Sequence, residues 1–514
     1  PRDWSSDVCS SDLPLILWPR VGRAGGLVDV SLLEVANLIY TNYSETMNRL
    51  INGSAEDPEH AFLGPVVDVP SIEPTADGFV GFTTNAQYQF DAFLEMIERP
   101  DLIGHPDFSS FGGRTMRFAE WNEIVHAWTG ARTTAQVIAR ASELRIPVAP
   151  VGNGETVLEL EHLTARGVFV DSADGRSRQP RSPFRFDGQD PPLPRPVPAL
   201  GAHDDTPFGH ERRSPQIGSA ADALPLTGLK VLDLTAWWAG PAATHVLGAF
   251  GAEVVHVESA ARLDGLRSVG GIVAGHYPRW WEASPHFLHT NANKLGVTLD
   301  FGDAEGRALI DRLIEWCDVV VENFTPRVLE GFGITEEHIE HINPNAVFVR
   351  MPAFGLTGPW RDYPGFAQTV EQLSGLAWRT GEPDDQPRVP RGPCDPLAGA
   401  HGALAILVAL ADRARSGHGG SVECTMVEMA LNLAAEQVVE WTTNGVLLQR
   451  IGNRSPDHAP QGLYPCAPDA NGAPPWLALS VADDADWAAL CGEIPALAGI
   501  TDPRVSHDEV DEHI

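Results

Sequence analysis

Two widely separated stretches of the chain carry the same residue pattern. Residues 25–36 read GGLVDVSLLEVA and residues 419–430 read GGSVECTMVEMA, with five identical residues out of twelve. At the same offset of 394 positions (419 minus 25), EPTADG at 73–78 matches APDANG at 467–472. A constant offset across separate blocks indicates a tandem duplication of a unit of roughly 400 residues.

The 514 residues are too few for two such units, so we expect each copy to be truncated. The opening segment contains SSD twice, has no helical or strand periodicity, and is expected not to belong to the native protein. The predicted parts are this segment (1–19), the C-terminal half of copy 1 with its small domain (20–206), a proline-rich linker (207–224), the large domain of copy 2 (225–450) and the start of its small domain (451–514).

Copy 2 alternates short apolar runs with stretches of helical spacing. This alternation predicts a parallel, doubly wound α/β sheet, in which ligands bind beyond the carboxyl ends of the strands. In copy 1, a predicted strand at 77–85 and a predicted helix at 86–97 indicate a smaller, mixed α/β module. The predicted strands of copy 2 are 230–235, 253–258, 318–324 and 346–351, and the helices are 239–252 and 303–317, the latter capped by Asp303.

Several common ligand-binding motifs are missing from copy 2. The turn after the first strand reads TAWWAGP rather than G-x-G-x-x-G, which disfavours a classical dinucleotide site. The sequence contains no G-x-x-x-x-G-K-[ST] phosphate loop and no G-x-S-x-G nucleophile elbow.

Composition excludes further classes of protein. The formal charge of −33 disfavours binding to nucleic acid or to anionic membranes. The longest apolar run, Ala403–Ala411, is shorter than the roughly 20 residues of a membrane span. The six cysteines include no C-x-x-C pair, so we expect no metal site, no disulfide framework and a cytoplasmic location.

Three blocks of copy 2, at 228–258, 291–334 and 391–430, together resemble class III CoA-transferases, the family of formyl-CoA and carnitine CoA-transferases. Copy 1 resembles the later half of that family through ELRIPVAPV at 143–151 and HLTARGVFVD at 162–171. The resemblance implies a Rossmann-like large domain, smaller mixed α/β domains and two interlocked chains. A tandem fusion would supply both links as an intramolecular pseudo-dimer, or the chain would form a homo-oligomer.

The resemblance also implies a nucleophile, since Asp395 in RGPCDPLAG matches the family's catalytic aspartate. Its carboxylate would attack an acyl-CoA thioester, and an aspartyl anhydride and an aspartyl-CoA thioester would carry CoA to a second carboxylic acid. A structural interpretation stands beside it, because aspartate followed by Pro396 is a common N-cap arrangement at a helix start. The thiol of Cys394 is a rival nucleophile, but no histidine lies at a recognisable spacing from it.

The resemblance further implies contacts with coenzyme A, which would be a substrate, with no permanently bound cofactor. Asn323 is also a typical turn residue, and Phe324 a typical core residue. Lys294 is one of only two lysines in the chain. The implied CoA-binding residues are Trp237, Trp238, Ala239, Lys294, Leu299, Asp300, Phe301, Asn323, Phe324 and Thr325.

Two alternative functions remain open. Related α-methylacyl-CoA racemases carry G-H-D where this chain has Gly365, Phe366 and Ala367, so the expected base is missing; Glu371 lies nearby at a different spacing. The third interpretation is a non-catalytic CoA-binding fragment, because the position in copy 1 that corresponds to Asp395 falls on Pro1.

Overall fold

The computed structural model describes residues 31, 70–193, 195–206, 224–268, 278–390, 392–468, 475–500, 510–511 and 514. The segment predicted to be non-native, nearly all of the 25–36 repeat block and most of the predicted linker lie outside the described residues.

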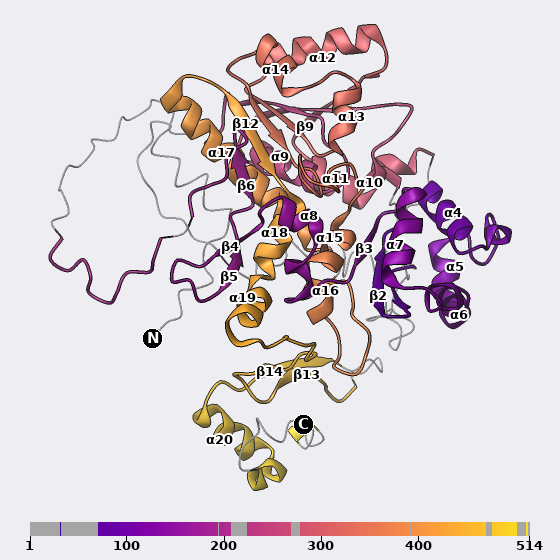
Figure 1. The fold of residues 1–514 in the computed structure, drawn as a ribbon, viewed down its shortest axis with the longest axis vertical. Coiled ribbons are helices and arrows are strands. Elements are labelled where there is room, and N and C mark those ends of the chain that lie inside the picture. The colour runs from indigo at the N-terminus through magenta and orange to yellow at the C-terminus, as the bar shows by residue number, and fades with distance from the viewer. Residues whose placement is uncertain are drawn as a thin grey trace.

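The first described module is a small sheet covered by helices, drawn in indigo in Figure 1. Its three strands pair antiparallel in the order β1-β2-β3, and their apolar side chains pack with the helices around Phe93 and Trp121. The predicted mixed α/β module is therefore confirmed. Its elements are β1 (Ile72–Thr75), β2 (Gly78–Phe82), α4 (Gln87–Met96), the 3-10 helix η3 (Pro100–Leu102), α5 (Phe111–Met116), α6 (Phe118–Thr129), α7 (Thr134–Glu143) and β3 (Val148–Pro150).

A large, mostly parallel sheet forms the centre of the molecule, with strand order β6-β12-β11-β10-β7-β8-β9. Only β6 runs antiparallel to its neighbour, and it comes from the first part of the chain. This arrangement confirms the predicted α/β fold class. The strands are β6 (Phe184–Phe186), β7 (Lys230–Asp233), β8 (Glu253–Glu258), β9 (Lys294–Thr298), β10 (Val319–Glu322), β11 (Val347–Arg350) and β12 (Gly420–Cys424).

Helices cover both faces of this sheet because successive strand residues point to opposite sides. Val319 and Val321 of β10 pack on one face, in the cluster that contains α9 and α17, whereas Val320 packs on the other with α12, α13 and α14. Asp303 caps α12 as predicted, accepting from two backbone N–H groups. The helices are α9 (Ala239–Ala249), α12 (Ala304–Trp316), α13 (Pro326–Gly331), α14 (Glu336–Ile342) and α17 (Cys394–Ser416).

Helix α17 is, by length and composition, apolar enough to cross a bilayer. It packs closely against α9 and β12, and half of its most apolar stretch is buried inside the protein. These contacts are typical of a core helix in an α/β domain.

Shorter elements connect the two parts of the chain and close its end. The antiparallel pair β13-β14, followed by α20 and η7, repeats the order of β1-β2, α4 and η3 in the first module. These elements are η4 (Thr156–Leu158), α8 (Glu161–Ala165), β4 (Phe169–Asp171), β5 (Arg178–Pro180), α10 (Gly265–Ser268), η6 (Trp280–Ala283), α11 (Pro285–Asn291), α15 (Ala367–Ser374), α16 (Leu376–Arg379), α18 (Met426–Leu433), α19 (Ala435–Asn444), β13 (Gln461–Pro465), β14 (Trp476–Ser480), α20 (Asp484–Glu493) and η7 (Pro495–Gly499).

Candidate active site

A small cleft lies beyond the carboxyl ends of the parallel strands, with a volume of about 70 Å³. The loops after β7, β10, β11 and β12 each contribute to it, as the topology of a doubly wound sheet requires. Its lining residues are Ala236, Trp237, Trp238, Ala239, Asn323, Phe324, Ala353, Gly365, Phe366, Asp395 and Met426.

Asp395 is the carboxylate of this cleft, and it lies in the first turn of α17. The helix begins at Cys394, with Pro393 at the N-cap position, and Asp395 makes no capping hydrogen bond. The N-cap interpretation of Asp395 is therefore wrong, because the helix starts two residues earlier than that interpretation requires. Burial raises the pKa of Asp395 from 3.8 to about 7, so the carboxyl group is about half ionised at neutral pH.

The loop that leads into α17 is held by a buried carboxylate from α15. Glu371 accepts hydrogen bonds from the backbone N–H of Gly392 at 3.1 Å and of Cys394 at 3.2 Å. Gly392 has φ +84°, a conformation that favours glycine. Glu371, which stands near the position of the racemase base, is thus directed at the backbone that carries Asp395, and it does not line the cleft.

The loop after β7 forms another wall of the cleft. Asn323 accepts from the N–H of Ala236 at 2.8 Å and donates to its carbonyl oxygen at 2.7 Å. Trp237 has φ +65°, and its indole meets the ring of Phe366 edge to face, with centroids 4.9 Å apart. Asn323 therefore lines the cleft and also fixes the loop that carries the two tryptophans.

Lys294 lies outside the cleft, in a buried ion pair. Its side chain is 2% exposed, and Nζ donates to Asp233 Oδ2 at 2.9 Å, to the carbonyl oxygen of Pro241 at 2.9 Å and to Asn291 Oδ1 at 2.8 Å. Burial lowers the pKa of Lys294, while the nearby Lys294 ammonium helps to hold the pKa of Asp233 well below its usual range against the effect of burial. Lys294 thus links β7, through Asp233, to α9, through the carbonyl oxygen of Pro241.

Four other residues implied by the resemblance also lie outside the lining of this cleft. Leu299 and Phe301 pack in the apolar cluster beneath α12. Asp300 is exposed and accepts from the N–H of Gly302. Thr325 stands at the N-cap position of α13 without a capping side-chain bond.

The structure therefore brings together six of the eleven residues singled out from the sequence. These six are Asp395, Trp237, Trp238, Ala239, Asn323 and Phe324. Ala353, Gly365 and Phe366 also line the cleft and were not predicted as site residues; Gly365 and Phe366 were considered only as the position of the racemase triplet. The rule that ligands bind at the carboxyl ends of parallel strands would have placed them near the site.

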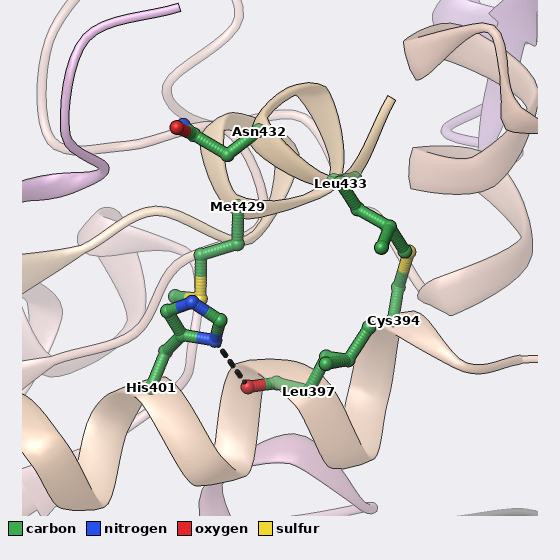
Figure 2. Close-up of a pocket in the computed structure, with 7 residues that line it drawn as sticks. Cys394, Leu397, His401, Met429, Asn432 and Leu433 are labelled. Atoms are coloured by element: carbon green, nitrogen blue, oxygen red, sulfur yellow. Dashed lines mark hydrogen bonds between the residues drawn. The ribbon is translucent and has the colours of Figure 1, made fainter. Parts of the chain in front are cut away.

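Cys394 points into a second, separate cavity of about 190 Å³ between α17 and α18 (Figure 2). Figure 2 shows its Sγ directed toward Leu433, while His401 lies two turns along α17 with Nδ1 bonded to the carbonyl oxygen of Leu397. Burial raises the pKa of the Cys394 thiol well above its usual range, and the charges of Glu371 and Asp395 act in the same direction. A protonated thiol is a poor nucleophile, so this environment disfavours Cys394 in that role.

Among the residues that the structure describes, no group of three or more histidine, cysteine, aspartate or glutamate side chains is arranged to hold a metal ion. Asp395 is the one carboxylate among the described residues that line the cleft, and most of the residues around it are aromatic or small.

Comparison with known proteins assigns this arrangement to a family. The model of CoA-transferase family III matches residues 19–204 and again residues 226–510. The chain belongs to CoA-transferase family III. A solved CaiB/BaiF family protein from Brucella suis shares the fold, with a TM-score of 0.51 and 28% identity, and the match covers 57% of this chain and 77% of that one.

Curated relatives include several named CoA-transferases. A probable CoA-transferase of Mycobacterium tuberculosis is 28% identical over 453 residues, 85% of this chain and 55% of its own length. The succinyl-CoA–D-citramalate CoA-transferase of Chloroflexus aurantiacus is 36% identical over 56% of this chain and 70% of its own. The acetyl-CoA:oxalate CoA-transferase of Acetobacter aceti is 31% identical over 56% of this chain and 71% of its own. The chain thus spans about half the length of the M. tuberculosis relative.

Proposed function

We propose that this chain carries the active site of a CoA-transferase, in which Asp395 moves CoA from an acyl-CoA thioester to a second carboxylic acid. The observation that carries the proposal is the position of Asp395 in one cleft with the loops after β7 and β10. These are the loops that the family resemblance implies for CoA binding, and family membership supports CoA chemistry in general.

The reaction needs a nucleophile, and an ionised Asp395 supplies it. The carboxylate attacks the thioester carbonyl carbon and the C–S bond breaks, so that CoA thiolate leaves and a mixed anhydride of the acyl group with Asp395 is formed. The thiolate then attacks the aspartyl carbonyl, releasing the donor acid as its carboxylate and forming an aspartyl-CoA thioester. The acceptor carboxylate repeats these two steps in reverse, so the product thioester forms and Asp395 is regenerated. The N-terminus of the 23-residue helix α17 favours the negative charge that develops at each step.

The raised pKa of Asp395 suits this role. A carboxylate with a pKa of about 7 is more basic, and hence more nucleophilic, than an ordinary aspartate. At neutral pH, a pKa of about 7 still leaves about half of the Asp395 carboxyl groups ionised. The gain in nucleophilicity therefore costs only about half of the ionised, reactive form.

The racemase alternative lacks a base at the position of the G-H-D triplet, where this chain has Gly365, Phe366 and Ala367. Ala367 is 2% exposed and apolar, and the nearby Glu371 bonds the backbone of the loop before α17. A racemase would exchange the α-hydrogen of an acyl-CoA for deuterium without any acceptor acid, whereas we expect no such exchange here.

We further propose that a second part completes the CoA site, as a homo-oligomer or as a pseudo-dimer built from tandem copies. The cleft of about 70 Å³ is smaller than the roughly 300–1,000 Å³ typical of pockets that enclose a cofactor-sized ligand. The repeated order of elements in the two parts of the chain supports the tandem arrangement, as does the single alignment of 453 residues with the M. tuberculosis relative. Light scattering of the purified chain, alone and with CoA, measures the oligomeric state.

The test compares Asp395→Ala with Asp412→Ala, which changes an exposed carboxylate on the same helix. Succinyl-CoA and acetyl-CoA serve as donors, with citramalate and oxalate as acceptors, because the relatives are named for these acids. We expect Asp395→Ala to lose transfer and Asp412→Ala to retain it. Hydroxylamine added with the donor should leave a hydroxamate on Asp395, detected by peptide mass spectrometry. Undiminished turnover by Asp395→Ala would overturn the proposal.

A further inference from the structure

Trp237 is held in a backbone conformation that tryptophan rarely adopts. Its φ of +65° lies in the left-handed region, where a residue with a bulky side chain is strained. Such a conformation persists only where surrounding contacts impose it. Because this residue lines the cleft beside Asp395, the contacts that impose it bear on the site.

Asp264, at the start of α10, makes the contact that fixes this backbone. Its side chain is buried, with Oδ2 accepting from the N–H of Trp237 at 2.9 Å and Oδ1 from the N–H of Leu266 at 2.7 Å. The carboxylate thus ties the loop after β7 to a segment 27 residues further along the chain. Burial raises the pKa of Asp264 to about 6, so the group is mostly ionised at neutral pH and both oxygens accept.

Gly265 lets the indole of Trp237 lie directly on this segment. A Cβ atom at this position would stand 2.2 Å from Cζ2 of the indole, which is far inside van der Waals contact. The ring is therefore held between α10 and the ring of Phe366, whose centroid is 4.9 Å away. Backbone and side chain of Trp237 are both positioned by residues 264 and 265.

We propose that Asp264 is a positioning residue that holds Trp237 as a fixed wall of the acyl-CoA cleft. The inference rests on the proposed function, because it assigns the cleft to acyl-CoA. Asp264 does not line the cleft, so it acts through the residues that it bonds, and of these Trp237 lines the cleft. The wall stands beside Asp395, and its loss should weaken acyl-CoA binding more than it slows the chemical step.

The test measures KM and kcat for Asp264→Asn in the full chain, together with the Kd of CoA by titration calorimetry. Asp264 accepts from two backbone N–H groups, those of Trp237 and Leu266. Asparagine keeps one acceptor oxygen and places an NH₂ group against the other N–H, so one buried hydrogen bond is lost. We expect KM for the acyl-CoA donor and Kd for CoA to rise about tenfold, the effect of one such bond, with kcat changed less than threefold.

The matched control is Asp318→Asn, at the opposite, amino-terminal end of the sheet. Asp318 also accepts a backbone N–H, from Lys230 at 3.0 Å, and it lies between β7 and β10 away from the cleft. This variant should lower the melting temperature and leave KM unchanged. A purely structural role of Asp264 would give the same result for both variants, which would overturn the inference.

A double variant isolates the effect of Asp264 on Trp237. Trp237→Gly removes the indole ring, and glycine adopts φ near +65° without strain. In this variant neither the backbone conformation nor a ring at position 237 depends on Asp264. Adding Asp264→Asn to Trp237→Gly should then raise KM no further, whereas an additive rise would overturn the inference. A wild-type chain that binds CoA without transferring it would overturn the proposed function. The Kd of CoA for wild type and for Asp264→Asn would then still decide the role of Asp264. A wild-type chain that binds no CoA would overturn both.

Discussion

Replacing Asp395 by asparagine should stabilise the folded chain at neutral and alkaline pH while it abolishes CoA transfer. Asparagine has almost the size of aspartate but never ionises, so the variant removes the charge and little else. Burial raises the pKa of Asp395 from 3.8 to about 7, which means that the folded protein binds this proton more tightly than the unfolded chain does. Ionisation of the carboxyl group therefore opposes folding.

The size of the effect follows from the two pKa values. As the pH rises from 3.8 to about 7, the unfolded chain gives up the proton while the folded protein keeps it, so wild type loses stability relative to the variant across this window. The difference between 3.8 and about 7 corresponds to about 4 kcal/mol above pH 7. Asp395 is only partly buried and lines a cleft, so water in the cleft reduces this to about 2 kcal/mol.

The assay is the melting temperature of each variant, measured by scanning calorimetry at about pH 5.5 and about pH 8. The gain of Asp395→Asn over wild type should be larger at the higher pH, because the window of proton loss is then fully crossed. Asp412→Asn is the control, since its exposed ion pair with Arg415 contributes little at either pH. A gain that is equal at both pH values, or a lower melting temperature at about pH 8, would refute a desolvated carboxylate at this position.

Two further predictions concern residues that support the site and the fold. Glu371→Gln should lower kcat about tenfold with KM little changed, because glutamine can accept from only one of the N–H groups that position the loop before Asp395; initial rates at saturating donor measure this. Arg166→Met should destabilise the fold by about 3–5 kcal/mol, because it leaves Glu423 and Glu428 buried without this partner. Denaturant unfolding tests the second prediction, and a variant as stable as wild type would contradict it.

The strands of the large sheet could be predicted from sequence where they are buried on both faces. The runs that became β7, β8, β10 and β11 are rich in valine and other apolar residues, and their observed ends lie within about two residues of those expected. Strand β9 was missed because it lies at the edge of the sheet with exposed side chains in KLGVT. Strand β6 was missed because three residues carry no periodicity, and its partner β12 lies more than two hundred residues further on.

The candidate site was predictable to the extent that it follows from topology and resemblance. Loop residues such as Trp237 and Asn323 stand where the ends of parallel strands must bring them. Asp264 and Glu371 were not predictable in their observed roles, because each acts by accepting backbone N–H groups from a segment more than twenty residues away. A side chain that bonds a distant backbone leaves no pattern in the sequence. The buried ion pair of Lys294 was not predictable for a related reason, since its partner Asp233 is 61 residues away.

The two parts of the chain that the repeat distinguishes are joined in one sheet rather than in separate domains. Strand β6, from the first part, pairs with β12 of the second, and β5 of the first part packs against α18 and α19 of the second. Ion pairs also connect the two parts, since the fully buried Arg166 guanidinium of the first part contacts Glu423 at 2.7 Å and Glu428 at 2.6 Å in the second. Without the first part, β12 would lose this neighbour and these two buried carboxylates would lose the Arg166 cation, at a cost of several kcal/mol. The scaffold behind Asp395 therefore contains residues from both sides of the predicted linker, and the boundary read from the repeat falls between two strands of one sheet, β6 and β7.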